Sequence, residues 1–298
     1  MSKHIFWLAS YPKSGNTLLR SIIASLFFTD NGIFKFKHLL KISQFEKTKR
    51  IKENIDLFTQ DYNNLHNTPI FYKYMLSMQE KKKLNFSEDF IFLKTHSGNF
   101  QINGSDFTSK DIIRGIIYLI RDPRDICISW SKHSDISIDE SINFMTNDLQ
   151  TLPWSEPSST EYFSKKKRPN SFLSNWENHI KSWVSVNWDT PKLIIKYEDL
   201  VYEKEKTILR IIEFFKQHYG FIFNNIKIKI PNIISSTNFK TMQKSENDFG
   251  FRESTNKNNF FSVGKSNQWT DNLSKKQIIK IENKFKITMK KLGYEIRY

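Results

Sequence analysis

Cysteine is nearly absent from this sequence, and its absence excludes several classes of protein. Cys127 is the only cysteine among the 298 residues, so the chain can form neither an intramolecular disulfide nor a zinc site built from cysteines. A small secreted domain held together by disulfides is therefore excluded. We expect the protein to work in a reducing compartment and take its location to be cytoplasmic.

Long apolar runs are missing as well. A transmembrane helix needs roughly 18 consecutive apolar residues, and the best candidates here, residues 22–28 and 115–120, are far shorter. Residues 1–10 lack the cleavage-site pattern of a signal peptide. We therefore expect no segment that spans a bilayer, and we interpret the start of the chain as a first strand.

Acidic residues are too few to balance the basic ones. Lysine and arginine number 46 against 31 aspartates and glutamates, which leaves a formal net charge of +15. With 38% hydrophobic and 26% charged residues, the composition is that of a globular chain with a sizeable core. The charge favours an anionic partner, which leaves nucleic acid, a membrane surface or a phosphate-rich small molecule.

Short apolar runs alternate with helical patterns along the chain. The runs at residues 5–9, 90–93, 116–120 and 193–195 have the length of strands and are followed by polar or charged residues. Strands that are apolar throughout are typical of a parallel sheet covered by helices on both faces. The sequence therefore predicts an α/β fold with a central, mostly parallel sheet, in a single domain over residues 1–298.

Local helix patterns support the same fold. Residues 17–28 and 207–215 carry apolar side chains at helical spacing. Capping boxes, in which a serine and a Glu or Gln three residues later satisfy each other's backbone N–H groups, are predicted at Ser137 and Ser274. Two further segments complete the predicted domain: a lid-like insertion rich in proline and serine at about 150–172, and a C-terminal loop and helix at about 243–298.

Residues suited to phosphate binding follow the predicted strands. Ligands of an open parallel sheet bind beyond the carboxyl ends of its strands. After the first strand, residues 11–17 read Tyr-Pro-Lys-Ser-Gly-Asn-Thr and lead into a helix, an arrangement that favours an anion. Lys13 precedes Gly15, so the G-x-x-x-x-G-K-[ST] loop of nucleotide triphosphatases is absent. After later strands come cations, hydroxyls and an imidazole: Lys94, Thr95, His96, Arg121 and Ser129.

Four segments, in this order, resemble the cytosolic type of sulfotransferase that uses 3′-phosphoadenylyl sulfate (PAPS). Residues 11–17 resemble the family's YPKSGTT loop, 93–96 its LKTH segment, 117–129 its IYLxRxPxDxxxS segment and 197–200 its YEDL. A weaker fifth segment runs through Thr237, Phe239, Met242, Gly264 and Trp269. The resemblance implies a fold like that of P-loop NTPases, PAPS as the sulfuryl donor, adenosine 3′,5′-bisphosphate (PAP) as the product, and no metal.

The same resemblance implies roles for the loop after the first strand. Lys13 and the Thr17 hydroxyl would hold the 5′-phosphosulfate, together with the loop residues Ser14, Gly15 and Asn16. Lys13 would also act in catalysis, because its ammonium group neutralises the charge that builds up on the leaving phosphate oxygen.

The other catalytic and phosphate-binding roles are implied by the second and third segments. His96 would be the general base, because an imidazole with a pKa of about 6.5 accepts a hydroxyl proton near neutral pH. Lys94 would steady the transferring sulfuryl group. Arg121 and Ser129 would bind the 3′-phosphate, which distinguishes PAPS from ATP. Ser129 also counts among the candidate catalytic residues.

The adenine and ribose would be held by residues of the later segments: Tyr197, Thr237, Phe239 and Met242. Gly264 and Lys265 also count among the candidate cofactor-binding residues. Two departures from the family's pattern affect this part of the site. Leu18 stands where the family often has a tryptophan that stacks on adenine, so Phe239 is the expected substitute. The family's Arg-Lys-Gly clamp on the 3′-phosphate is reduced at residues 262–269, and the candidates to replace it are Lys265 and Arg252.

Plainer interpretations of single residues stay open at this point. Arg121 could form only an ion pair with Asp122 or Asp125, and Tyr197 could only pack at the start of a helix. His96, taken alone, could be a surface or core imidazole without a catalytic role.

Two other functions stay open as well. A small-molecule kinase with an atypical phosphate loop would use the same strand, loop and helix, although no acidic metal-binding motif is evident. A basic protein that binds polyanions or nucleic acid would explain the charge, but no helix-turn-helix or RNA-binding pattern supports specific recognition. The acceptor is expected to be a small molecule or a glycan, and the sequence determines neither its identity nor the oligomeric state.

Overall fold

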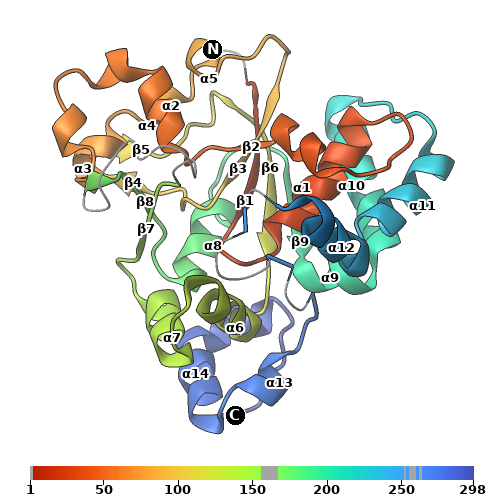
Figure 1. The fold of residues 1–298 in the computed structure, drawn as a ribbon. Helices are drawn as coiled ribbons and strands as arrows, with labels where there is room; N and C mark the ends of the chain where they lie inside the picture. Colours follow the sequence, from red (N-terminus) through yellow and green to blue (C-terminus); the bar gives the residue numbers. More distant parts are fainter. Residues whose placement is uncertain (1–2, 156–166, 252, 255–259, 262–263) are drawn as a thin grey trace. The chain divides into compact units, whose positions relative to one another are not determined.

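A five-stranded sheet with the strand order β2-β3-β1-β6-β9 is the central feature of the computed structural model, which describes residues 3–155, 167–251, 253–254, 260–261 and 264–298 (Figure 1). Its strands are Ile5–Ser10 (β1), Ser43–Gln44 (β2), Ile91–Thr95 (β3), Ile113–Ile120 (β6) and Lys192–Lys196 (β9). β3 pairs in parallel with both β1 and β2. The predicted α/β fold with a parallel sheet is therefore confirmed.

The chain divides into two compact units. The first unit contains residues 1–11, 43–118 and 147–192, and the second contains residues 12–42, 119–146 and 193–298. The expectation of a single domain over residues 1–298 stays a prediction.

The first unit is built around β1 and β3. All six residues of β1 are buried, which agrees with a strand whose two faces are both covered. Two short antiparallel pairs accompany these strands: Gln101–Ile102 (β4) with Ser105–Asp106 (β5), and Thr151–Pro153 (β7) with Asn170–Phe172 (β8). The helices are Thr48–Glu53 (α2), Thr68–Tyr72 (α3), Met75–Met78 (α4), Lys81–Leu84 (α5) and Trp176–Val184 (α8), and Ile55–Phe58 and Tyr62–Asn64 form 3₁₀ turns.

The pairing of β7 with β8 joins the two ends of the predicted lid at 150–172. Residues 156–166, which make up its middle, lie outside the described residues. The lid-like insertion therefore stays a prediction.

The second unit is mainly helical. Its helices are Asn16–Phe28 (α1), Pro123–Ser134 (α6), Ile138–Thr146 (α7), Tyr197–Tyr202 (α9), Lys204–Tyr219 (α10), Ile226–Ser236 (α11), Phe239–Phe249 (α12), Trp269–Asn272 (α13) and Lys275–Lys291 (α14), with a 3₁₀ segment at Phe36–Lys41. Both predicted capping boxes are confirmed, because Ser137 and Ser274 exchange hydrogen bonds with Glu140 and Gln277 respectively. These caps begin α7 and α14, which pack against each other (Figure 1).

Among the residues that the structure describes, no helix has the length and apolar character that crossing a bilayer requires.

Candidate active site

The predicted site residues are divided between the two units. Lys94 and His96 belong to the first unit, and the other candidates belong to the second.

The loop between β1 and α1 has an unusual backbone. Lys13 and Gly15 both have positive φ angles, 64° and 93°, and for a lysine this left-handed conformation costs roughly 1 kcal/mol. A Cβ atom at Gly15 would lie 2.3 Å from Cδ2 of Tyr197, so the position requires glycine. Gly15 also precedes α1 without a side-chain cap. The first N–H groups of α1 are therefore not bonded by a capping side chain, as in anion sites at helix N-termini.

Arg121 joins three of the predicted cofactor residues. Its guanidinium donates to the backbone oxygens of Lys13 (3.0 Å) and Lys265 (3.3 Å), and it lies 4.2 Å from the centroid of the Tyr197 ring. The alternative ion pair with Asp125 is present only at 4.0 Å. Tyr197 is 7% exposed, so it packs against both Arg121 and Gly15 at the start of α9.

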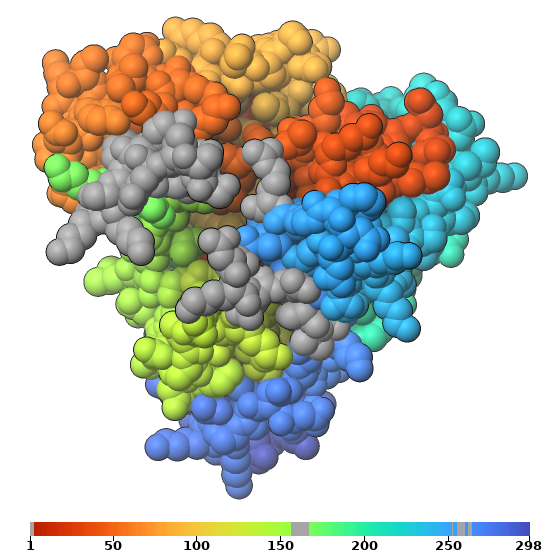
Figure 2. Space-filling view, viewed as in Figure 1, coloured from red at the N-terminus to blue at the C-terminus, as the bar shows by residue number. Residues whose placement is uncertain are grey.

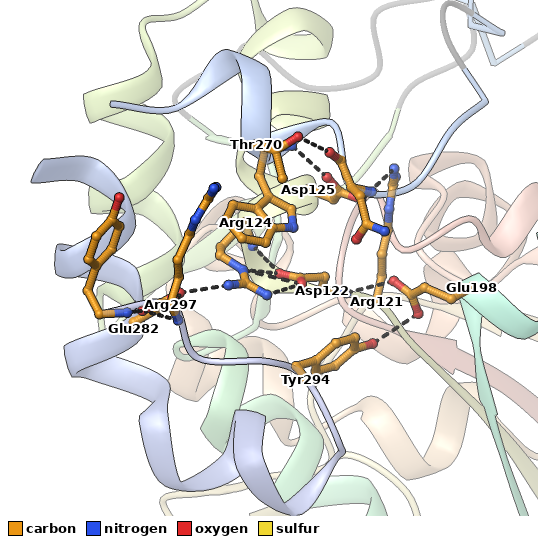
Figure 3. A network of polar contacts seen from close by, with 12 residues as sticks. Arg121, Asp122, Arg124, Asp125, Glu198, Thr270, Glu282, Tyr294 and Arg297 are labelled. Carbon is orange, nitrogen blue, oxygen red and sulfur yellow. Dashed lines mark hydrogen bonds and ion pairs between the residues drawn. The ribbon is translucent and has the colours of Figure 1, made fainter. Parts of the chain in front are cut away.

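A buried polar network supports Arg121 from the residues that follow it (Figure 3). Arg124 forms ion pairs of 2.6 Å with Asp122 and with Glu282. Asp125 accepts hydrogen bonds from the backbone N–H groups of Asn267 and Trp269, and burial raises the pKa of its carboxyl although Arg121 opposes that shift. The network thereby ties the segment around Lys265 to the start of α6.

Several buried polar atoms near this loop have no hydrogen-bond partner in the described part of the chain. They include Oγ of Ser14, Nε of Arg121 and Oγ of Ser266. Buried polar groups are normally paired, so each of these atoms needs an explanation. Hydroxyl and guanidinium donors are also the groups that bind phosphate oxygens. The residues of this loop therefore fit a phosphate-bearing ligand.

A carboxylate already contacts the first turn of α1. Thr17 donates to Glu253 at 3.1 Å, and Arg20 forms a 2.6 Å ion pair with the same carboxylate. Nζ of Lys13 lies 4.6 Å from the centroid of the Phe260 ring. Thr17 and Lys13 thus contact the segment in which we expected a substitute for the missing clamp. Arg252, one of the two candidates, lies outside the described residues.

Two of the predicted adenine residues, Phe239 and Met242, belong to an apolar cluster. Met242 is buried with Phe34, Leu39 and Phe261, and Leu18 and Phe239 pack against these four side chains. A Cβ at Gly264 would lie 2.0 Å from the Phe239 ring, so this glycine permits the close approach. The surfaces of α12 and of the segment that precedes β2 lie side by side (Figure 2). The cluster brings together Leu18 and Phe239, the residue expected to take the place of the missing tryptophan.

Thr237 and Ser129 are not part of the apolar cluster, and across the described ranges no hydrogen bond joins either of them to Arg121 or Lys13. Thr237 is buried at the end of α11, where its hydroxyl donates to the backbone oxygen of Ile233 at 2.7 Å. Its own backbone oxygen accepts from Lys204 at 2.9 Å, and burial lowers the pKa of Lys204 to about 8. Ser129 is half-buried on α6, in the chain segment that follows Arg121. Cofactor contacts of Thr237 and Ser129 stay predictions.

In the first unit, β3 delivers Lys94 and His96. Lys94 is 7% exposed, and its ammonium group lies 3.4 Å from Oε1 of Gln44 on β2. His96 is half-buried, and its Nδ1 lies 2.8 Å from the backbone oxygen of Ser10. A carbonyl oxygen only accepts, so Nδ1 carries the proton and Nε2 carries the lone pair of the neutral ring. This tautomer leaves Nε2 as the basic nitrogen.

Sequence reasoning missed three residues that contact the candidates, Glu46, His179 and Glu253, and it also missed Arg20, which pairs with Glu253. Helical spacing could have indicated His179, because it lies on α8 between the buried Trp176 and Trp183. The sequence around Glu46 and Glu253 has no pattern that distinguishes them from surface carboxylates.

Curated relatives match much of the chain at low identity. Sulfotransferase 1E1 of Homo sapiens is 23% identical over 238 residues, which cover 80% of this chain and 66% of the human protein. Sulfotransferase 2A2 of Rattus norvegicus is 25% identical over 202 residues, which cover 64% of this chain and 61% of the rat protein. The matched region thus spans less than two thirds of the length of these relatives.

Solved structures share the fold. A retinol dehydratase in complex with androsterone and the inactive cofactor PAP superposes with a TM-score of 0.60 at 17% identity, over 100% of this chain and 83% of the other. Mouse sulfotransferase SULT7A1 complexed with PAP gives a TM-score of 0.57 at 18% identity, over 97% of this chain and 84% of the other. The sequence profile described as the sulfotransferase domain matches residues 3–293, nearly the whole chain. The chain therefore belongs to the sulfotransferase domain family.

Proposed function

We propose that this chain is an enzyme that transfers a sulfuryl group from PAPS to a hydroxyl or amine of an organic acceptor. Membership of the sulfotransferase domain family supports the reaction class. The observation that carries the proposal is the loop at Lys13–Thr17, where buried atoms of Ser14 and Arg121 have no partner in the described residues. Two of the similar structures were solved with PAP, which supports the same donor here.

The residues would divide the work as follows. Bound PAPS supplies an activated sulfuryl group with a phosphate as leaving group. Lys13 and the N-terminus of α1 would neutralise the charge on that phosphate, and Arg121 would bind the 3′-phosphate. Nε2 of His96 would take the proton of the acceptor while Lys94 steadies the sulfuryl group. The proposal needs no metal, and the acceptor is a small molecule or a glycan.

Binding of the product separates this proposal from an ATP-using enzyme. We expect PAP to raise the melting temperature of the protein and ATP to do so far less, because a ligand that binds only the folded state stabilises it in proportion to its affinity. Arg121→Met should abolish most of the PAP effect, whereas Arg114→Met, on β6, should retain it. Equal stabilisation by PAP and ATP, or consumption of ATP that depends on Mg²⁺, would favour the kinase instead.

Turnover tests the role of His96. In an assay of PAPS consumption with a panel of phenols, alcohols and glycans, and with the product identified by mass, His96→Ala should lower kcat about 100-fold or more. The affinity for PAP should change little. His66→Ala, which removes an exposed histidine, is the matched control. Wild-type turnover in His96→Ala would remove this residue from the mechanism. The cytoplasmic location stays a prediction.

A further inference from the structure

The loop that carries His96 is held by a buried carboxylate. Glu46 is 3% exposed, and its Oε1 accepts from the backbone N–H groups of His96 (3.2 Å) and Ser97 (3.1 Å). The same oxygen accepts from the hydroxyls of Thr95 and Ser97. Hydrogen bonds to a carboxylate are stronger than those between neutral groups. Glu46 therefore holds the backbone N–H groups of His96 and Ser97 in place.

The carbonyl side of His96 is held by a second buried residue. Nε2 of His179, a fully buried side chain, lies 2.9 Å from the backbone oxygen of His96. Nδ1 of His179 lies 2.7 Å from the hydroxyl of Tyr118. The carbonyl can only accept, so Nε2 of His179 donates to it and Nδ1 accepts from Tyr118. The Tyr11 ring packs edge-to-face with the same imidazole, with the two ring centroids 5.4 Å apart.

We propose that Glu46 and His179 are positioning residues for His96. Together they bond both backbone groups of His96, while the backbone oxygen of Ser10 holds its ring at Nδ1. These bonds restrict both the position of the His96 Cα atom and the orientation of its ring. They therefore keep the basic Nε2 pointing in a fixed direction. The inference rests on the proposed function, because it gives these residues a role only if His96 is the base.

The role predicts a loss of turnover without a loss of donor binding. A displacement of about 1 Å can cost a catalytic group about 100-fold in rate. We therefore expect His179→Leu to lower kcat by about 10- to 100-fold and to leave the dissociation constant of PAP within about twofold. His179→Gln should recover most of kcat, because a Gln amide can donate to the same carbonyl.

His4 provides a matched control for lost stability. It is 3% exposed in the same unit, and its Nε2 lies 2.9 Å from the backbone oxygen of Gln79. His4→Leu thus removes the same kind of buried hydrogen bond without touching His96, and it should lower the melting temperature while kcat stays at the wild-type value. If His179→Leu does not fold, Tyr118→Phe replaces it. We expect that variant to lower kcat severalfold, because it removes the hydroxyl that orients His179.

Nitrogen NMR of labelled histidine gives a readout independent of turnover. In the wild type, the His96 ring should be protonated at Nδ1 alone, and in Glu46→Gln and His179→Leu it should become a mixture of tautomers. Equal kcat in His179→Leu and His4→Leu, or a His179→Gln variant no better than His179→Leu, would overturn the positioning role. His96→Ala separates the two ideas. If it is inactive while His179→Leu turns over normally, only the positioning role fails, and if it is fully active, the proposed base fails too.

Discussion

The loop after β1 and the loop after β3 differ in whether their polar groups are hydrogen-bonded within the protein. At residues 96–97 after β3, the amides of His96 and Ser97 and the carbonyl of His96 are all bonded to buried side chains. After β1, the hydroxyl of Ser14 is buried without a partner in the described residues, and α1 begins without a side-chain cap. The backbone groups of one loop are bonded by the protein, whereas the other loop contains a buried hydroxyl that no described residue pairs.

The difference separates two requirements of group transfer. A general base must point one atom in a fixed direction, so its loop benefits from bonds within the protein. A site for a charged donor must instead present unsatisfied N–H and O–H groups, which the ligand pairs when it binds. Under the proposed function the left-handed Lys13 would belong to the second case, since backbone strain of this kind is concentrated at ligand sites.

Lys13→Met should lower turnover more than any other change considered, because it removes the ammonium group from the loop between β1 and α1. We expect kcat to fall by about 100- to 1000-fold, the loss that follows removal of one electrostatic group acting on a transition state, and PAP binding to weaken as well. Lys35→Met, at an exposed lysine of the same unit, should have no effect on either. Unchanged turnover in Lys13→Met would mean that the loop binds without taking part in catalysis.

His179, which bonds the loop after β3, should make the free energy of unfolding depend on pH. Burial lowers the pKa of His179 to about 4 from 6.5. Between pH 6.5 and 4, His179 is therefore protonated in the unfolded chain but neutral in the folded protein. The free energy of unfolding should fall as the pH is lowered through that range. The shift corresponds to about 3 kcal/mol, and this stability is fully present above pH 6.5.

Urea unfolding of the wild type and of His179→Gln across this pH range isolates that contribution. The variant has no imidazole at this position, so its stability should vary less between pH 6.5 and 4, although the carboxylates still titrate. Parallel curves for the two proteins would mean that the His179 imidazole takes up its proton at the same pH in the folded and the unfolded protein.

Gly15→Ala should damage the loop after β1 through its backbone. The alanine would have to adopt a φ of 93° and displace the Tyr197 ring. Gly220 also has a positive φ, 69°, but a Cβ there meets nothing within 4 Å, so Gly220→Ala should cost only about 1 kcal/mol. We expect Gly15→Ala to cost about 2 kcal/mol more, as overpacking does, and to weaken PAP binding. Equal losses in thermal unfolding would show that Tyr197 moves aside easily.

The elements of the fold were predictable where the pattern is local. Apolar runs predicted β1, β3, β6 and β9, and the capping boxes at Ser137 and Ser274 predicted the beginnings of α7 and α14. These features depend on residues close together in the chain. The two-residue strand β2 escaped prediction because it is held by its pairing with β3, far along the chain.

The candidate site was predictable in part for the same reason. The motif at Lys13–Thr17 is contiguous, and Arg121 has a distinctive position directly after a strand. The hydrogen bonds of Arg121 to Lys13 and Lys265, by contrast, join residues 108 and 144 positions apart. Glu46 lies 50 positions from His96, and nothing near it in the sequence distinguishes it from a solvated carboxylate. Such contacts arise from the fold.

Glu253 offers the smallest but most specific test of the contrast between the loops. Its carboxylate, 26% exposed, accepts from Thr17 and pairs with Arg20 at the first turn of α1. A carboxylate there uses the same donors as a phosphate and repels one by its charge. Glu253→Gln should therefore tighten PAP binding by about threefold, an effect in the range of a partly exposed ion pair.

Glu205→Gln, which removes an exposed carboxylate from α10, makes the same change in net charge and should leave PAP affinity unchanged in calorimetry. Arg20 keeps its 2.9 Å bond to the backbone oxygen of Ile42 in Glu253→Gln, so the first turn of α1 retains that support. Weaker PAP binding in Glu253→Gln would reverse the interpretation: the carboxylate would then build the donor site, and the loop after β1 would depend on the protein for its order as the loop after β3 does.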